Sequence, residues 1–311
     1  MIRTLKRVDG PKLFQLMDRE FPEESALLGG RPEEFQKVVR RYFRWDSQFV
    51  LGLLRLVGRP IIRILAVEAD GELAGITMVT FPRGSGYISD VVVDPKFRRR
   101  GFARQLLEEG RRVARRAKRR FVVLDVLEQN TGARALYDSL GYRPLRARSQ
   151  FILEPVPTTP APAATSGIRP FAKTDAASLV AIVTRQTPSL VNDVAPTTEQ
   201  MFIGSALANR MMNLEEAAWV IDRGHGAEAY VSANCSPVFE AGHLSAPVVG
   251  ESVDPSLADT LVRTAIAWCA ARKVPRVLTV VAEENPRGAA ALEAAGFHHA
   301  FKLWTLYRTV D

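Results

Sequence analysis

The chain of 311 residues has few metal-binding or disulfide-forming side chains. It contains two cysteines, Cys235 and Cys269, and four histidines, with no spacing typical of metal ligands. A disulfide scaffold and a zinc site are therefore disfavoured, and we expect no bound metal. Long apolar runs are also missing: no run approaches the roughly 18 residues of a membrane span, and the N-terminal MIRTLKRVDG lacks the apolar stretch of a secretory signal. We expect a cytoplasmic protein with no membrane partner.

What is present is enough apolar material for a core. Apolar residues make up 47% of the chain and charged residues 24%, which favours a globular protein, and 311 residues favour two domains. Positive charge is concentrated in the first half: residues 1–150 carry 30 Lys and Arg against 18 Asp and Glu, whereas residues 151–311 carry 12 against 16. A polyanionic ligand, a nucleic acid or merely solvated arginine-rich helices would each account for this asymmetry.

A change in composition divides the chain. The segment EPVPTTPAPAATSG, residues 154–167, has no periodic apolar face and is rich in proline, which predicts an extended linker between domains at residues 1–153 and 168–311. The start of the second domain resembles the start of the first. Ile2-Arg3 and Asp9 recur as Ile168-Arg169 and Asp175, and each set predicts a strand, a helix N-cap and a helix.

Further matches continue this repeat in the same order. Val93-Asp94-Pro95 recurs as Val253-Asp254-Pro255, Asn130 as Asn285, and Leu140-Gly141-Tyr142 as Ala295-Gly296-Phe297. The interval from Asp94 to Asn130 is 36 residues and that from Asp254 to Asn285 is 31, so this alignment predicts a second copy that is five residues shorter there.

The periodicity of the first copy predicts an α+β fold. Asp70-Gly71 is typical of a tight hairpin turn, and a strand–helix–strand unit follows the antiparallel hairpins. Two such copies give two tandem domains, each a mixed central sheet flanked by helices. The predicted strands are residues 2–7, 62–69, 73–81, 87–93, 121–127 and 151–153, and the predicted helices are residues 11–20, 32–43, 102–118 and 131–140.

The most informative segment is VDPKFRRRGFARQLL, residues 93–107. A strand ends at Pro95, and a basic loop with Gly101 opens directly into an amphipathic helix. The unpaired N–H groups and partial positive charge of a helix N-terminus attract phosphate, and Gly101 allows a ligand to approach the backbone closely. The segment therefore predicts a pyrophosphate site. It matches neither the P-loop nor the G-x-G-x-x-G loop, which disfavours an NTPase or a dinucleotide dehydrogenase.

Two motifs together resemble the GNAT superfamily of N-acetyltransferases. V-x-P-x-x-R-x-x-G-x-A is matched by Val93, Pro95, Arg98, Gly101 and Ala103, and is similar to the acyl-CoA loop of that family. The downstream N-x-x-A-x-x-L-Y … G-[FY] pattern is matched by residues 130–142. The resemblance covers essentially residues 1–153, and it implies acetyl-CoA as acyl donor with a small-molecule or peptide amine as acceptor.

The resemblance also implies roles for particular residues. Tyr137 matches the usual general acid, which protonates the departing thiolate, although a tyrosine beside Leu136 on a helix is also common in cores. Asn130 would contact the coenzyme or act only as a helix N-cap. The strand backbone would bind pantetheine and the acetyl carbonyl, and the loop backbone and its arginines would bind the pyrophosphate: Val91, Val92, Val93, Arg98, Arg99, Arg100, Gly101, Phe102, Ala103 and Arg104.

The general base is less determined by the sequence. We choose Asp90, on the strand before the loop, over Glu68, Asp125 and Glu128, and deprotonation through water alone stays open. The basic residues 111–120 are expected to be partly solvated, to meet the 3′-phosphate of the coenzyme, or to bind nucleic acid. Nucleic acid is not our expected partner, because no groove-reading motif accompanies these charges. The apolar segment Asp46–Pro60 is expected to pack in the core, with an acceptor-site wall or a dimer surface as alternatives.

The second copy lacks the features of the phosphate site. After Asp254-Pro255 it has no arginine or glycine at the loop position, and Leu292 stands where the first copy has Tyr137. We therefore expect acetyl transfer from the first domain and no productive acetyl-CoA binding by the second. The alternative is a non-catalytic acyl-CoA-binding or nucleic-acid-binding regulator. A homodimer is left open by the sequence.

Overall fold

The computed structural model describes residues 2–5, 9–10, 12–13, 15–16, 62–81, 84–158, 167–204, 214–235 and 241–311. They form two compact units. Unit 1 contains the described residues up to Leu145 together with Trp304–Asp311, and unit 2 contains Arg146–Leu303. The predicted helices at 11–20 and 32–43, the Asp46–Pro60 segment and much of the predicted linker lie wholly or largely outside the described residues.

Unit 1 is built on a mixed sheet. Its strands lie in the order β1-β2-β3-β4-β5-β13, with β1 to β4 antiparallel and β4 parallel to β5. Asp70 and Gly71 have φ values of 53° and 75°, so the predicted tight turn is confirmed. The strands are β1 (Ile2–Thr4), β2 (Ile62–Ala69), β3 (Glu72–Thr80), β4 (Ser85–Val93), β5 (Phe121–Leu127) and the C-terminal part of β13 (His298–Thr309).

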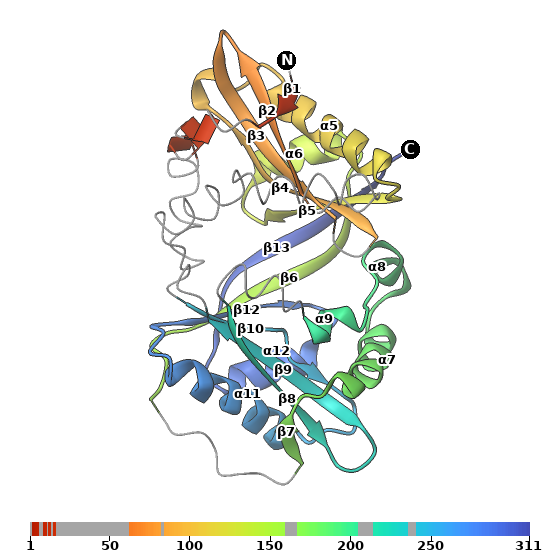
Figure 1. Cartoon of the computed structure of the whole chain (residues 1–311), viewed down its shortest axis with the longest axis vertical. Coiled ribbons are helices and arrows are strands. Elements are labelled where there is room, and N and C mark those ends of the chain that lie inside the picture. Colours follow the sequence, from red (N-terminus) through yellow and green to blue (C-terminus); the bar gives the residue numbers. More distant parts are fainter. Residues whose placement is uncertain are drawn as a thin grey trace, which may run out of the picture. The chain divides into compact units, whose positions relative to one another are not determined.

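The helices of unit 1 include η2 (Pro95–Phe97), α5 (Phe102–Arg116) and α6 (Thr131–Ser139). Helix α5 buries Leu106, Leu107, Gly110 and Ala114 against the sheet, where β5 contributes Val122, Leu124 and Val126 to the same core. The contact is close: a Cβ on Gly86 would lie 2.7 Å from the Cβ of Ala114. Glycine at this position therefore lets α5 lie directly on β4 (Figure 1).

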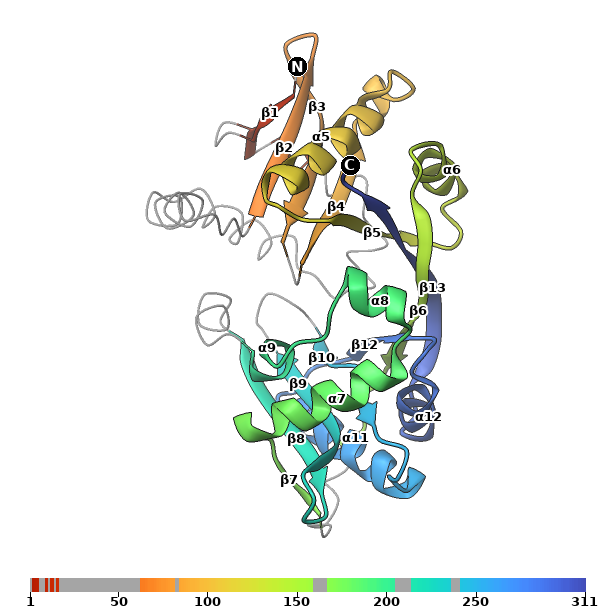
Figure 2. The ribbon, with the colours of Figure 1, turned by 90° about the vertical axis from the view of Figure 1, so that its right-hand side faces the viewer.

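Unit 2 repeats this architecture. Its strands lie in the order β6-β12-β10-β9-β8-β7, with β10 and β12 parallel and β11 paired to β9. Helix α7 covers one face of β8 and β9, and α11 covers the other (Figure 2). The strands are β6 (Arg143–Leu153), which begins in unit 1, β7 (Ile168–Pro170), β8 (Glu215–Asp222), β9 (Ala227–Cys235), β10 (Gly242–Leu244), β11 (Val248–Val249) and β12 (Val277–Ala282). The helices are η3 (Lys173–Asp175), α7 (Ala176–Gln186), α8 (Ser189–Val194), α9 (Gln200–Ile203), α11 (Pro255–Ala270) and α12 (Pro286–Ala294).

Buried helix positions confirm the internal repeat. Adding the offset between Asn130 and Asn285, which is 155, to the four buried positions of α5 gives Leu261, Val262, Ala265 and Cys269, and all four are buried in α11. The same offset converts the bounds of α6, Thr131–Ser139, into those of α12, Pro286–Ala294. Each helix begins after an asparagine whose side chain accepts a bond from the N–H three residues later. The two tandem α+β units expected from the sequence are present.

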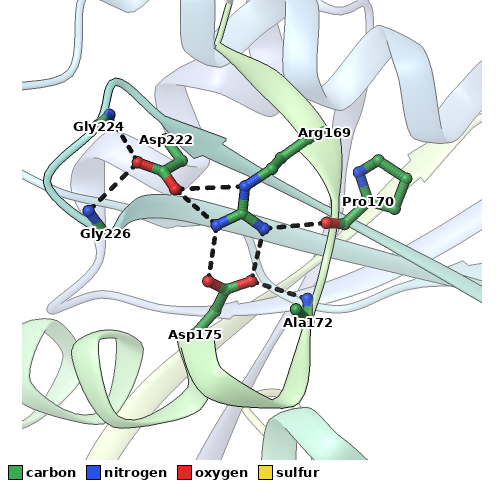
Figure 3. Close-up of polar contacts among 7 residues, drawn as sticks. All are labelled: Arg169, Pro170, Ala172, Asp175, Asp222, Gly224 and Gly226. Atoms are coloured by element: carbon green, nitrogen blue, oxygen red, sulfur yellow. Dashed lines mark hydrogen bonds and ion pairs between the residues drawn. The ribbon is translucent and has the colours of Figure 1, made fainter.

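An arginine cluster holds an edge strand of each unit in place, β1 in unit 1 and β7 in unit 2. Arg169 on β7 donates two bonds of 2.8 Å to Asp175 and bonds of 2.6 and 3.2 Å to Asp222 at the end of β8 (Figure 3). Arg3 makes the equivalent contacts with Asp9 and Glu68 in unit 1. The predicted N-cap function of Asp175 is wrong: its carboxylate accepts from Arg169 and from the N–H of Ala172 and does not cap α7.

The compact units differ from a simple linear division of the chain. Residues 146–153 of β6 belong to unit 2, where they pair with β12, and Trp304–Asp311 return to unit 1. The returning segment buries Leu306 and Val310 in the hydrophobic core of unit 1 that also contains the buried residues of α5. Each unit therefore takes a strand segment from the opposite half of the sequence.

Candidate functional site

The site begins at a fork, the place where the parallel strands β4 and β5 separate. β4 and β5 pair only at Ser85–Tyr87 with Phe121–Val123, although β4 continues to Val93. A register shift between Ile76 and Met78 marks a bulge in the β3–β4 ladder, and Asp90 adopts a φ of 52° there. Beyond Tyr87, β4 therefore presents to β5 an edge without ladder bonds, and this edge includes Val91, Val92 and Val93.

The loop after β4 leads to an uncapped helix end. Gly101, with a φ of 78°, is the N-cap of α5 and provides no side-chain bond to it. The first bond of the helix runs from the N–H of Gln105 to the carbonyl of Gly101, at 3.1 Å. The N–H groups of residues 102–104 precede that bond, so the helix end offers donors and partial positive charge to an anion.

A pocket of about 750 Å³ joins the strand edge to this helix end. That volume is typical of sites for a large organic ligand. Eleven predicted site residues line it: Val91, Val92, Val93, Arg98, Arg99, Gly101, Phe102, Ala103, Arg104, Asn130 and Tyr137. The sequence interpretation missed four others, Phe97, Gly132, Ala133 and Leu136. The small residues Gly132 and Ala133, close after Asn130 in the chain, were the available signal for two of them.

Two predicted residues do not line this pocket, and Arg100 is one of them. Its guanidinium donates to Asp70 at 2.9 Å and lies 5.5 and 5.3 Å from the ring centroids of Phe97 and Phe102. The hydrogen bond from Arg100 holds the pKa of the exposed Asp70 carboxyl below its usual value. The Arg100 side chain therefore braces the loop against the β2–β3 turn.

Asp90 is the other predicted residue outside the pocket lining. It is half-buried, and the Ser89 hydroxyl donates to its carboxylate at 2.8 Å. Burial raises the pKa of Asp90 above its ordinary value, while the bond from Ser89 acts in the opposite direction. A raised pKa suits a carboxylate that accepts a proton near neutral pH.

The three other carboxylates considered as bases have partners on neighbouring strands. Asp125 accepts from the Tyr87 phenol at 2.8 Å and from the Thr305 hydroxyl at 2.7 Å. Glu68 accepts from Arg3, and Glu128 accepts from the indole N–H of Trp304 at 3.3 Å. These bonds give all three a structural function.

Tyr137 lies on α6 with 7% of its surface exposed, and it lines the pocket. Its ring centroid is 5.8 Å from that of Tyr142. Asn130, the N-cap residue directly before the same helix, combines both predicted functions: its side chain accepts from the N–H of Ala133 at 3.1 Å, and it also lines the pocket. The N-cap therefore places a polar side chain at the pocket without further cost to the helix.

The basic face of α5 has mainly intramolecular partners. Arg111 donates to Glu108 at 3.0 Å and to the carbonyls of Val310 and Asp311, each at 2.7 Å. Arg112 and Arg116 each donate to Glu109 at 3.1 Å. These contacts connect α5 to the C-terminal segment and stabilise the helix surface.

Unit 2 corrects the sequence alignment of the loop. The N–H of Gly250 donates to the carbonyl of Glu228 at 2.9 Å, as the N–H of Asp94 donates to that of Ala74 at 2.9 Å. Gly250, and not Asp254, therefore occupies the position of Asp94, so the expectation of a five-residue shortening is wrong. The loop between the strand and the helix is nevertheless shorter in unit 2 than in unit 1. The main reason is that α11 begins at Pro255, soon after β11, whereas α5 begins only at Phe102.

The equivalent fork of unit 2 is bridged by its own side chains. Asp254 caps α11 by accepting from the N–H of Ser256 at 2.8 Å, and Asn285 donates to the carbonyl of Pro247 at 2.8 Å. Arg287 donates to the carbonyl of Gly250 at 3.1 Å. A Cβ on Gly288 would lie 2.5 Å from the Pro247 oxygen, so α12 approaches the strand more closely than a larger residue would allow. The counterparts in unit 1, Gly132 and Ala133, line the pocket.

The described residues offer neither a candidate metal cluster nor a candidate membrane-spanning helix. Within those residues, no group of three or more His, Cys, Asp or Glu side chains is placed to hold a metal ion. Among the helices that the structure describes, none is long and apolar enough to cross a membrane.

Comparison with known proteins agrees with this geometry. Residues 12–142 match the acetyltransferase (GNAT) family model. A tandem GNAT protein from the clavulanic acid biosynthesis pathway has a similar structure, with a TM-score of 0.64 and 17% identity over 100% of this chain and 98% of that one. A GCN5-related N-acetyltransferase from Sphaerobacter thermophilus is similar with a TM-score of 0.65 and 19% identity, and the match covers 100% of this chain and 96% of that one. A putative acetyltransferase from Pyrococcus horikoshii is similar with a TM-score of 0.59 and 14% identity, and the match covers 99% of this chain and 89% of that one.

At these identities the solved structures establish the fold, and the family match concerns the residues of unit 1. Residues 12–142 therefore resemble the acetyltransferase (GNAT) family, and the chain as a whole is similar in fold to a tandem GNAT protein.

Proposed function

We propose that unit 1 is an acetyl-CoA-dependent N-acetyltransferase that transfers the acetyl group directly to a primary amine in a ternary complex. One observation carries the proposal: a single pocket joins the unpaired edge of β4, the uncapped end of α5 and the Tyr137 side chain. The edge suits pantetheine and the helix end suits a pyrophosphate, with Arg98, Arg99 and Arg104 beside it.

The residues divide the proton transfers between them. The amine nitrogen attacks the thioester carbonyl, and a backbone N–H of Val91–Val93 stabilises the negative charge that develops on oxygen. As the carbon–sulfur bond breaks, Tyr137 gives its proton to the departing thiolate. The nitrogen loses its proton to Asp90, directly or through a water molecule. The raised pKa of Asp90 supports this function, because a carboxyl of ordinary pKa is a weaker base.

The acceptor in this proposal is the amine of a small molecule or a peptide. Unit 2 does not take part in coenzyme binding, because Asp254, Asn285 and Arg287 bridge the equivalent positions. Its contribution is structural in this proposal, since residues 146–303 lie between the two parts of the chain that form unit 1.

The test measures thiol release from acetyl-CoA across a panel of amines, with the wild type and Tyr137→Phe. Loss of the phenol removes the proton donor, so kcat should fall by about 100-fold or more while the Kd of coenzyme A stays the same. Leu292→Tyr, at the equivalent position of unit 2, is the matched control and should change neither quantity. Coenzyme binding without turnover of any amine would instead support the non-catalytic alternative.

A further inference from the structure

Tyr142 is a buried phenol whose hydroxyl has no evident structural use. It is 2% exposed, and its Oη has no hydrogen-bond partner among the described residues. Its ring packs in the core of unit 1 against the ring of Tyr137, with the two planes inclined at 59°. Burying a hydroxyl without a partner destabilises a fold, and phenylalanine would fill the same space without that cost.

The second copy shows that the core does not require this hydroxyl. Phe297 follows Gly296 as Tyr142 follows Gly141, and it is 4% exposed in the equivalent core. Leu292 likewise replaces Tyr137. The unit with an open pocket therefore carries both hydroxyls, and the unit whose fork is bridged carries neither. Packing alone does not explain why Tyr142 keeps its oxygen.

The surroundings of Tyr142 favour its neutral form. Burial raises its pKa well above the usual value; Tyr137 and Glu108 add to this, and Arg308 and Arg111 oppose it. Those charges largely compensate one another, because Glu108 accepts from Arg308 at 2.6 Å and from Arg111 at 3.0 Å. Tyr142 therefore keeps its proton at neutral pH and is available as a hydrogen-bond donor.

We propose that Tyr142 is a positioning residue for Tyr137, to whose Oη its buried hydroxyl donates a hydrogen bond, directly or through one water molecule, when Tyr137 gives up its proton. The inference rests on the proposed function. In the step concerned, the O–H bond of Tyr137 breaks and the S–H bond of coenzyme A forms, so the negative charge moves from sulfur to the Tyr137 oxygen. Tyr142 keeps its own proton, and solvent then reprotonates Tyr137.

The variant Tyr142→Phe in the full chain tests this inference. Loss of the donor should lower kcat about tenfold with little change in the KM for acetyl-CoA, as for a charge-assisted hydrogen bond made in the transition state. Because the Tyr137 phenolate would be less stabilised, the alkaline limb of the kcat profile should move to higher pH. The melting temperature should stay the same or rise, since a buried unpaired hydroxyl is removed. The matched control Phe297→Tyr should lower the melting temperature and leave kcat unchanged.

Several outcomes would overturn the inference. An unchanged kcat and pH profile would do so, and so would a fall in melting temperature together with a loss of coenzyme binding, which indicates a purely structural hydroxyl. If Tyr137→Phe is as active as the wild type, the proposed function of Tyr137 fails first. If only Tyr137→Phe is impaired, the inference fails alone.

A second measurement decides the inference without any turnover. Carbon-13 labelled tyrosine allows the pKa of Tyr137 to be followed by NMR in the wild type and in Tyr142→Phe. We expect a Tyr137 pKa that is higher in the variant by about one unit, the change that corresponds to a tenfold effect. Equal values in the two proteins would contradict the proposal.

Discussion

The two units share their ladders, buried helix positions and arginine clusters, yet they differ at one edge of the sheet. In unit 1 the helix after the fork begins with Gly101 and no side-chain cap, whereas in unit 2 the helix is capped by its own Asp254. In unit 1 Gly132 lines a pocket, whereas its counterpart Arg287 donates to the loop carbonyls. The comparison separates what the fold requires from what a ligand site requires.

Equivalent positions that face the core carry similar side chains in the two units. Equivalent positions at the fork carry different ones. Gly86 lies against Ala114, and its counterpart Gly242 lies against Cys269, so a glycine under the helix is needed in both. A helix N-terminus, by contrast, needs some acceptor for its N–H groups, and either a ligand or a carboxylate can supply one. In unit 2 the carboxylate of Asp254 supplies that acceptor.

The largest expected effect comes from removing the segment that returns to unit 1. A chain that ends at Leu303 loses Leu306 and Val310 from the hydrophobic core on which α5 packs, together with the hydrogen bond from Thr305 to Asp125. We expect no detectable heat with coenzyme A in calorimetry. The milder Leu306→Ala should reduce the free energy of unfolding of unit 1 by about 2–4 kcal/mol, measured by hydrogen exchange in α5.

Thr309→Ala is the control for that experiment. Thr309 is exposed on the same strand, so its truncation should leave coenzyme binding intact. If the chain ending at Leu303 bound coenzyme A as tightly as the full chain, the C-terminal segment would not be part of a functional unit 1.

A smaller effect should follow from giving unit 1 the cap of unit 2. In Gly101→Asp the carboxylate would take the N–H groups at the start of α5 and repel a pyrophosphate. At an effective dielectric constant near 20 this repulsion is about 3 kcal/mol, so we expect the Kd of coenzyme A to rise by about 100-fold. No heavy atom lies within 4 Å of a Cβ at this position, so the new side chain has space.

Gly101→Asn is the matched control for the charge. Asparagine meets the same backbone strain at a φ of 78° and can cap the helix equally well, but it is neutral. Its effect should be clearly smaller than that of aspartate, and the difference should shrink at high salt. Equal effects of the two variants would exclude charge repulsion and leave strain or occlusion as the cause.

Much of the fold could be predicted from sequence because local signals agreed with tertiary structure. The Asp70-Gly71 turn, the α5 periodicity and the asparagine caps depend on neighbours in the chain, and the structure confirms them. The return of residues 304–311 to unit 1 could not be predicted, because a strand does not encode which sheet edge it joins. The loop alignment failed for a related reason: Asp94 and Asp254 share a capping chemistry but lie at different distances from their strands.

The candidate site shows the same division. The residues that gather at the pocket were recognisable because a motif of backbone donors and small residues is local in sequence. The orphaned hydroxyl of Tyr142 gave no sequence signal, since a tyrosine after glycine is as compatible with core packing as phenylalanine. Arg100 was indistinguishable from its neighbours by sequence, and only the structure pairs it with Asp70.

The smallest expected effect compares the arginine clusters, Arg3→Met against Arg169→Met. The Arg3 side chain is 17% exposed and Arg169 is 38% exposed, so solvent screens the second cluster more. Loss of Arg3 should lower stability by about 1–2 kcal/mol and loss of Arg169 by less than about 1 kcal/mol, as for partly exposed ion pairs. Arg185→Met, at an exposed position of α7, is the control.

The pH dependence of the Arg169 variant provides the sharper measurement. The bond from Arg169 is the main cause that holds the pKa of Asp175 below its ordinary value. A lowered pKa in the folded state stabilises the fold above the pKa of the unfolded chain, about 3.9, and this contribution is lost as the pH falls through the folded-state pKa. The melting temperatures of wild type and Arg169→Met should therefore differ most near neutral pH and converge in acid. A difference that stays constant from pH 7 to the most acidic pH at which both proteins fold would mean that Arg169 stabilises β7 by packing, and not by its charge.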